Sequence, residues 1–140
     1  MTNTNTNKQH AEIGPSSLNY RAQCTAWTPA AQTDTTHADE GTLLHSAMET
    51  DNPEALDGEQ LACYDTLQKF LAPLQEGAEQ VLRERRLDIK LGRHETFGMC
   101  DRIIIKGRLA HVIDFKFGRN AVPDAAENLQ ALAYAVGVFD

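Results

Sequence analysis

The feature that most constrains the fold of this chain is a pair of short apolar runs, Ile103–Ile105 and Leu109–Ile113, separated by three residues. Both runs are rich in β-branched side chains, which favour strands. The gap reads Lys-Gly-Arg, and a glycine such as Gly107 in a short polar gap between two such runs predicts a β-hairpin. A chain of 140 residues is long enough for one domain with a buried core, and we expect this hairpin at its centre.

Charged residues stand at one end of the predicted hairpin. Side chains of a strand point alternately to its two faces, so Asp114 and Lys116 project from the same face of the second strand. Asp101 heads the first strand. A register that aligns these faces brings two carboxylates and one ammonium group together. A lone Asp-x-Lys is far more often a solvated strand end, so the interpretation depends on what accompanies it.

Three further residues favour a functional site. His45 precedes the hairpin on a predicted helix, and Gln130 and Tyr134 follow it four residues apart, on one face of another predicted helix. Two carboxylates form a hard oxygen site suited to Mg²⁺ or Mn²⁺. A lysine beside such an ion positions water or stabilises negative charge that develops on phosphorus.

At this point the sequence resembles a known family. Asp101 followed by Asp114-Phe-Lys116 resembles the signature of the PD-(D/E)XK nuclease superfamily. The Gly-Thr-x-x-His segment ending at His45, and Gln130-Ala-Leu-Ala-Tyr134, resemble the flanking motifs of its RecB-like branch, which includes phage exonucleases and CRISPR-adaptation nucleases. The similarity covers about residues 13–140 and is closest to phage-encoded RecB-like proteins.

The resemblance implies an α/β domain over residues 13–140, with a restriction-endonuclease-like core: a three-stranded meander in a mixed sheet flanked by helices. The sequence pattern predicts helices at 19–26, from 40 with Thr42 as cap, from 59 to a break at Pro73, at 74–86, and from an Asp124–Glu127 capping box onward. Predicted strands are 87–91, 96–105 and 109–117. The nuclease core usually has a further strand after the last helix. Either this chain is a C-terminally truncated form, or another subunit supplies the missing part.

The resemblance also implies a metal site. Asp101 and Asp114 are expected to hold one or two divalent ions, helped by His45 and the backbone carbonyl of Phe115. An imidazole ligand shifts the preference from Mg²⁺ towards Mn²⁺. Glu49, one helical turn after His45, is a weaker candidate ligand. Gly98, three residues before Asp101, is expected to let substrate or metal approach.

The implied activity is hydrolysis of DNA phosphodiester bonds, in the manner of an exonuclease, in phage or bacterial DNA processing or recombination. Lys116 is expected to position the attacking water, whose pKa the metal lowers, and to offset charge in the transition state. Gln130 and Tyr134 are implied to orient DNA and this lysine. The alternative is a catalytically inactive module on the same fold that binds DNA, or a recombination or other phage protein.

The charge distribution is consistent with a DNA partner. The formal net charge is −7, but residues 83–119 carry ten basic and five acidic side chains, a balance of +5. The remaining three basic and fifteen acidic residues give −12. Arg102, Arg108 and Arg119 are therefore candidates for contacts with DNA phosphates, although chance segregation of solvated charge produces the same pattern.

Cysteines and termini indicate the compartment. Cys24, Cys63 and Cys100 are too few and too widely spaced for a disulfide framework, which favours reduced thiols and a cytoplasmic location. In CRISPR-associated relatives a cysteine at the place of Cys24 binds an iron–sulfur cluster, with three ligands after the Gln-Tyr helix. No cysteine follows Cys100, so we expect no such cluster.

Residues 1–12 are predicted to be a disordered tail, and neither a signal peptide nor a membrane span is expected. The oligomeric state stays open.

Overall fold

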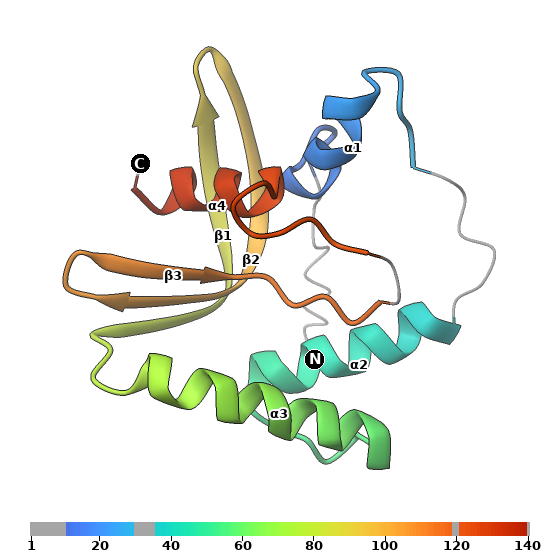
Figure 1. The fold of residues 1–140 in the computed structure, drawn as a ribbon, viewed down its shortest axis with the longest axis vertical. Helices are drawn as coiled ribbons and strands as arrows, with labels where there is room; N and C mark the ends of the chain where they lie inside the picture. The colour runs from blue at the N-terminus through green and yellow to red at the C-terminus, as the bar shows by residue number, and fades with distance from the viewer. Residues whose placement is uncertain (1–10, 30–35, 119–120, 140) are drawn as a thin grey trace, which may run out of the picture.

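The computed structural model describes residues 11–29, 36–118 and 121–139, without the side chains of 36–39. It shows an α/β arrangement in which an open three-stranded antiparallel sheet is flanked by helices (Figure 1). The elements are η1 (Pro15–Ser17), α1 (Leu18–Gln23), α2 (Thr36–Thr50), α3 (Gly58–Gln75), β1 (Gln80–Leu91), β2 (His94–Lys106), β3 (Leu109–Ile113) and α4 (Leu129–Phe139). The predicted meander is confirmed. The mixed sheet is not present, because every strand pair in the described residues is antiparallel. The predicted tail at 1–12 falls mostly outside the described residues.

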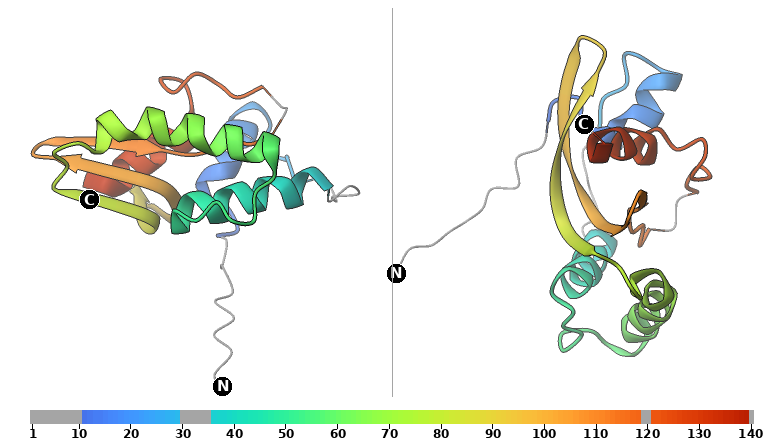
Figure 2. Two further views of the ribbon diagram at one scale, coloured as in Figure 1. Left: turned by 90° about the horizontal axis from the view of Figure 1, so that it is seen from below. Right: turned by 90° about the vertical axis from the view of Figure 1, so that its left-hand side faces the viewer.

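The sheet is dominated by a long β1–β2 hairpin that bends along its length (Figure 2). The helix predicted for 74–86 is wrong, because β1 already begins at Gln80. Val81 and Leu82 pair with Ile104 and Ile103 of β2. These long-range apolar pairs outweigh the local helical preference of the charged segment that follows them. The shorter β2–β3 hairpin turns at Gly107, whose positive φ of 57° suits glycine.

One core cluster joins α2 and α3 to the sheet. It includes Leu44, Ala47 and Met48 of α2 together with Leu71 of α3 and Ile104 of β2. The α2 residues follow a spacing of three and four, which places them on one helical face.

Two predictions about these two helices are wrong. Helix α2 begins at Thr36, so Thr42 lies inside it rather than at its cap. Helix α3 begins after a capping box of Asp57 and Gln60 and runs through Pro73 without a break. Pro73 lies in the last turn, where its missing N–H removes only one hydrogen bond before the helix ends at Gln75.

A second core cluster joins α4 to the opposite end of the hairpin, where α1 also packs (Figures 1 and 2). Gly137 allows this close approach, because a Cβ atom there would lie 2.8 Å from Ile89 Cγ1. The predicted capping box at Asp124 and Glu127 is wrong. Asn128 caps the helix instead, and its Oδ1 accepts hydrogen bonds from the backbone N–H groups of Gln130 and Ala131 at 3.1 and 3.3 Å.

Arg102 was predicted to contact DNA, and the structure contradicts this. Arg102 lies in β2, and its side chain is fully buried. One guanidinium nitrogen donates to the Met48 carbonyl at 2.5 Å near the end of α2, and another donates to Gln75 Oε1 at 2.8 Å at the end of α3. A buried cation needs such partners, and the unpaired carbonyls of a helix C-terminus supply negative potential. Arg102 therefore ties two helix ends to the sheet.

No helix among the residues with described positions is long and apolar enough to cross a lipid bilayer.

Replacing Arg102 by alanine should lower the free energy of unfolding by about 3 kcal/mol, because it leaves a cavity and removes the donor to the buried Met48 carbonyl and to the part-buried Gln75 side chain. The exposed Arg108 is the matched control, and Arg108→Ala should change the free energy of unfolding by less than about 0.5 kcal/mol. Urea denaturation followed by circular dichroism measures both. Equal effects of the two substitutions would contradict the structural role of Arg102.

Candidate active site

The β2–β3 register places two carboxylates opposite one another. Arg102 pairs with Ile113, so the next step along the two strands sets Asp101 across from Asp114, just beyond the end of β3. The backbone N–H of Phe115 donates to Asp101 Oδ2 at 2.5 Å and continues the connection between the strands. Both side chains are largely buried, with exposed fractions of 12% and 15%. The two carboxylates therefore meet, but the predicted strand over 109–117 is too long, because β3 ends at Ile113 and both Asp114 and Lys116 follow it.

His45 reaches the same place from α2. Its Nε2 lies 3.1 Å from the Phe115 carbonyl oxygen and 3.5 Å from Asp101 Oδ2. Its Nδ1 lies 2.9 Å from the carbonyl oxygen of Gly41, one turn earlier on the helix. Both ring nitrogens thus face oxygen acceptors, which suits the doubly protonated imidazolium.

Opposing effects act on the pKa of His45. Burial of the imidazole lowers this pKa, but the hydrogen bond to Asp101 and the bonds to the Gly41 and Phe115 carbonyls outweigh burial and raise it above 6.5. The protonated form of His45 therefore depends on the Asp101 carboxylate and on two backbone carbonyls.

Asp114 is engaged at both oxygens. Its Oδ2 forms an ion pair with Lys116 Nζ, and its Oδ1 accepts a hydrogen bond of 3.0 Å from Gln130 Nε2. Burial raises the pKa of Asp114 above its ordinary value, and the Lys116 ammonium only partly offsets this. The lysine side chain is 41% exposed, so the positive charge lies where solvent and a ligand can reach it.

Gln130 and Tyr134 lie on one buried face of α4, as predicted. Tyr134 Oη donates to the Met99 carbonyl at 2.8 Å, and Gln130 Nε2 lies 3.4 Å from the same hydroxyl. Burial raises the pKa of Tyr134 far above its ordinary value, so the phenol stays neutral and remains a donor.

The prediction that Gly98 admits substrate is wrong. A Cβ there would lie 2.8 Å from Tyr134 Cε1, so Gly98 makes room for the tyrosine ring.

Glu84 of β1 was missed from the sequence. It lies between the Arg83–Arg102 and Arg85–Cys100 pairs of β1 and β2, which puts it level with Asp101. Glu84, Asp101 and Asp114 thus form one row across β1, β2 and the residue after β3. All three line a cavity of about 230 Å³, together with Gln130 and Tyr134. Glu84 has a φ of 43°, an unfavourable conformation for a non-glycine residue that is often retained at functional sites. The wrong helix at 74–86 hid it, whereas the neighbouring Val81-Leu82 pair was the signal for a strand.

The donor types at this site fit a hard divalent ion. Neighbouring ligands of an octahedral ion with bonds of about 2.1 Å lie about 3 Å apart. His45 Nε2 lies at comparable distances from the Phe115 oxygen and Asp101 Oδ2. Within the described part of the chain, however, no three His, Cys, Asp or Glu side chains form a metal-binding group in this arrangement. An ion would have to share or displace the contacts that Lys116 and Gln130 make with Asp114.

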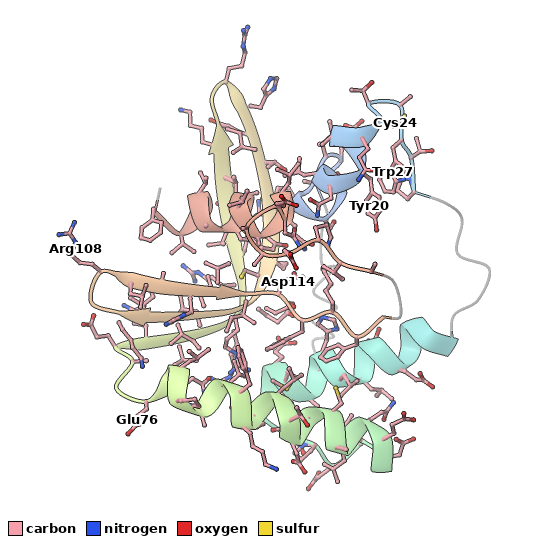
Figure 3. All side chains as sticks on the ribbon, viewed as in Figure 1. Tyr20, Cys24, Trp27, Glu76, Arg108 and Asp114 are labelled. Atoms are coloured by element: carbon pink, nitrogen blue, oxygen red, sulfur yellow. The ribbon has the colours of Figure 1, made fainter. Side chains whose placement is uncertain are left out.

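Two other predicted site residues, Glu49 and Arg108, do not line the cavity that holds Asp101 and Asp114. Glu49 is exposed on α2, one turn beyond His45. Arg108 is exposed at the tip of the β2–β3 hairpin, well away from Asp114 (Figure 3). Arg119 falls outside the described residues. The structure therefore brings together the predicted catalytic and principal metal-binding residues, but it places neither Arg102 nor Arg108 with them.

The chain belongs to a protein family of unknown function, DUF2800, whose family model matches residues 67–140. The match includes the row of carboxylates, Lys116 and the Gln-Tyr pair of α4, while His45 lies outside it. Neither the curated proteins nor the solved structures contain a match to this chain.

In metal-free protein, the imidazole of His45 should titrate with a pKa above 6.5, because its protonated form has three oxygen partners. The raised pKa means that this group stabilises the fold below its unfolded pKa, and that this contribution disappears as the pH rises through the folded pKa. Two-dimensional ¹H–¹⁵N spectra of the ring in EDTA measure the titration. Asp101→Asn should lower the pKa; an unchanged value would show that the His45–Asp101 contact is absent in solution.

Proposed function

We propose that this chain is a divalent-metal-dependent nuclease that hydrolyses DNA phosphodiester bonds in the manner of an exonuclease, on a restriction-endonuclease-like core of the PD-(D/E)XK superfamily. The observation that carries this proposal is the convergence of Asp101, Asp114, Lys116 and His45 beside the Gln130–Tyr134 pair. These residues come from four separate segments of the chain. A solvated strand end needs none of these contacts, whereas metal-assisted phosphodiester hydrolysis can use carboxylates to hold the ion and a nearby lysine to stabilise the transition state. The setting would be phage or bacterial DNA processing or recombination.

The metal-binding residues would be Asp101, Asp114, His45 and the carbonyl of Phe115. A bound Mg²⁺ or Mn²⁺ supplies a Lewis acid and lowers the pKa of water at neutral pH. His45 must be neutral at Nε2 to serve as a ligand, so its raised pKa makes binding weaker at low pH. The bond from Phe115 N–H holds Asp101 in place, and Gln130 holds Asp114.

Lys116 would act on the phosphate. Its ammonium group lies beside Asp114 and remains partly exposed, so it can contact a non-bridging phosphate oxygen and the attacking water. Positive charge at that position stabilises the additional negative charge of the transition state. Tyr134 stays neutral and fixes Gln130 through the shared buried face of α4.

A second candidate function is a catalytically inactive module that binds DNA or another recombination protein. One observation favours it: Lys116 and Gln130 already occupy the oxygens of Asp114, and the described side chains include no ready metal-binding group of three.

Cleavage separates the two functions. The assay uses end-labelled linear and circular DNA, single- and double-stranded, with Mn²⁺, Mg²⁺ or EDTA. Metal-dependent loss of linear DNA is expected, and Lys116→Ala should reduce its rate by at least about 100-fold because a charge aimed at the transition state is removed. DNA affinity in EDTA should change much less. Arg108→Ala is the matched control and should cleave at the parental rate. A Lys116→Ala protein that cleaves like the parent would falsify the role of this lysine.

Metal binding gives an independent test. Mn²⁺ at about 100 times its Kd should add about 2.7 kcal/mol to the free energy of unfolding, since it binds only the folded protein. Thermal denaturation with Mn²⁺ or EDTA measures this as a rise in Tm. Asp114→Asn should abolish the rise and Arg108→Ala should retain it. If Mn²⁺ does not change the Tm of the parent protein, the result would support the proposal of an inactive module.

A further inference from the structure

A second cavity, of about 410 Å³, opens beside Lys116 on the side away from Glu84. Its walls come from η1 and α1, from Lys116, Gly118 and residues 121–123, and from the start of α4. The volume falls within the range of about 300 to 1,000 Å³ typical of small-molecule sites. Lys116 and Gln130 line both this cavity and the candidate active site, so the two are adjacent.

Tyr20 of α1 gives this cavity an aromatic wall. Its ring stacks on Trp27, with ring centroids 4.8 Å apart and planes at 11° (Figure 3). Two backbone hydrogen bonds, Cys24 N to Tyr20 O and Trp27 N to Cys24 O, curl the chain so that Trp27 returns over the tyrosine. Tyr20 remains 51% exposed although one ring face is covered. The other ring face is therefore available to a planar ligand.

The wall that carries Tyr20 is fixed to the active-site helix. Asn19 Nδ2 donates to Asn128 Oδ1 at 3.0 Å, and Asn19 Oδ1 accepts from the backbone N–H of Leu129 at 2.8 Å. Asn128 caps α4, which carries Gln130. The aromatic wall and the catalytic groups therefore belong to one connected unit, and little order has to be created when a ligand binds.

We propose that this cavity holds a nucleobase stacked on Tyr20, with the phosphate of the same nucleotide at Lys116. This inference rests on the proposed function and names its substrate as a strand with an unpaired base at the site. An aromatic face provides a platform for any base, and Gln23 and Ser16 offer polar groups for its edge. A base in a duplex remains stacked on its neighbours, so the strand must be single-stranded or frayed at this position.

The test compares two ten-residue strands, oligothymidylate and an abasic strand with tetrahydrofuran in place of every nucleoside. Fluorescence anisotropy in EDTA gives the Kd of each. The parent protein should bind oligothymidylate about 5- to 100-fold more tightly than the abasic strand, as expected for one stacked base. Equal affinities, or no binding of either strand, would overturn the proposal without any variant being made.

Variants locate the stacking. Tyr20→Ala should reduce the ratio of the two Kd values towards one, and Tyr20→Phe should preserve it because the ring remains. Phe139 is the control, since it is an exposed aromatic residue at the far end of α4, about 14 Å along the helix from Gln130. Phe139→Ala should leave the ratio unchanged. A ratio that Tyr20→Ala does not alter would place the stacked base elsewhere.

The two proposals fail separately, because binding in EDTA needs no catalysis. If the protein discriminates against the abasic strand through Tyr20 but never cleaves DNA, the base site is supported and the nuclease function is contradicted. If the protein cleaves DNA but its preference does not depend on Tyr20, the nuclease function is supported and the base site is contradicted.

Discussion

The antiparallel register of the three strands is the constraint on which the rest of this structure depends. It sets Glu84, Asp101 and Asp114 in one row across the sheet, at the point where β3 ends. A shift of one residue in either pairing would move a carboxylate to the opposite face. The apolar partners of the same strands fix the register, because Ile103 and Ile104 must enter different cores on the two faces. Apolar packing thus positions the polar site.

The two core clusters also explain why the site has several walls. The α2–α3 cluster holds the helix that carries His45, and the α4 cluster holds the helix that carries Gln130 and Tyr134. His45 from one of these helices and Gln130 from the other therefore meet the sheet at Asp101 and Asp114. Burial then makes their charges interdependent. The pKa values of His45 and Asp114 both rise, the first because of its hydrogen bonds to oxygen acceptors and the second because of burial.

Three basic residues of the central hairpin have three different environments. Arg102 is buried and binds helix-terminal acceptors, Lys116 pairs with Asp114 while staying partly exposed, and Arg108 is exposed at a turn. Composition alone places all three in one positively charged block. Only Lys116 lies where a phosphate at the candidate site would meet it. The basic character of a segment is therefore a poor guide to which of its residues contacts a ligand.

The sequence alone was sufficient for the central hairpin and for the faces of its residues. Alternation with period two in a strand assigns residues to its two faces, and spacing of four in a helix places Gln130 and Tyr134 on one face, wherever the elements lie. Bringing Asp101 to Asp114 also needs the register between the two strands. Local rules failed at residues 74–86 and at the ends of α2 and α4. There the outcome depended on distant partners, such as the pairing of Val81 with Ile104 and the bond from Leu129 to Asn19.

The tertiary structure decided the burial of Arg102, the place of Glu84 and the aromatic wall at Tyr20. Each depends on contacts between residues far apart in the chain, and the sequence shows only one side of each contact. A guanidinium group can be buried only where acceptors surround it, as the Met48 carbonyl and the Gln75 side chain do for Arg102. For the same reason, Glu84 belongs to the site only because the register of β1 sets it opposite Asp101.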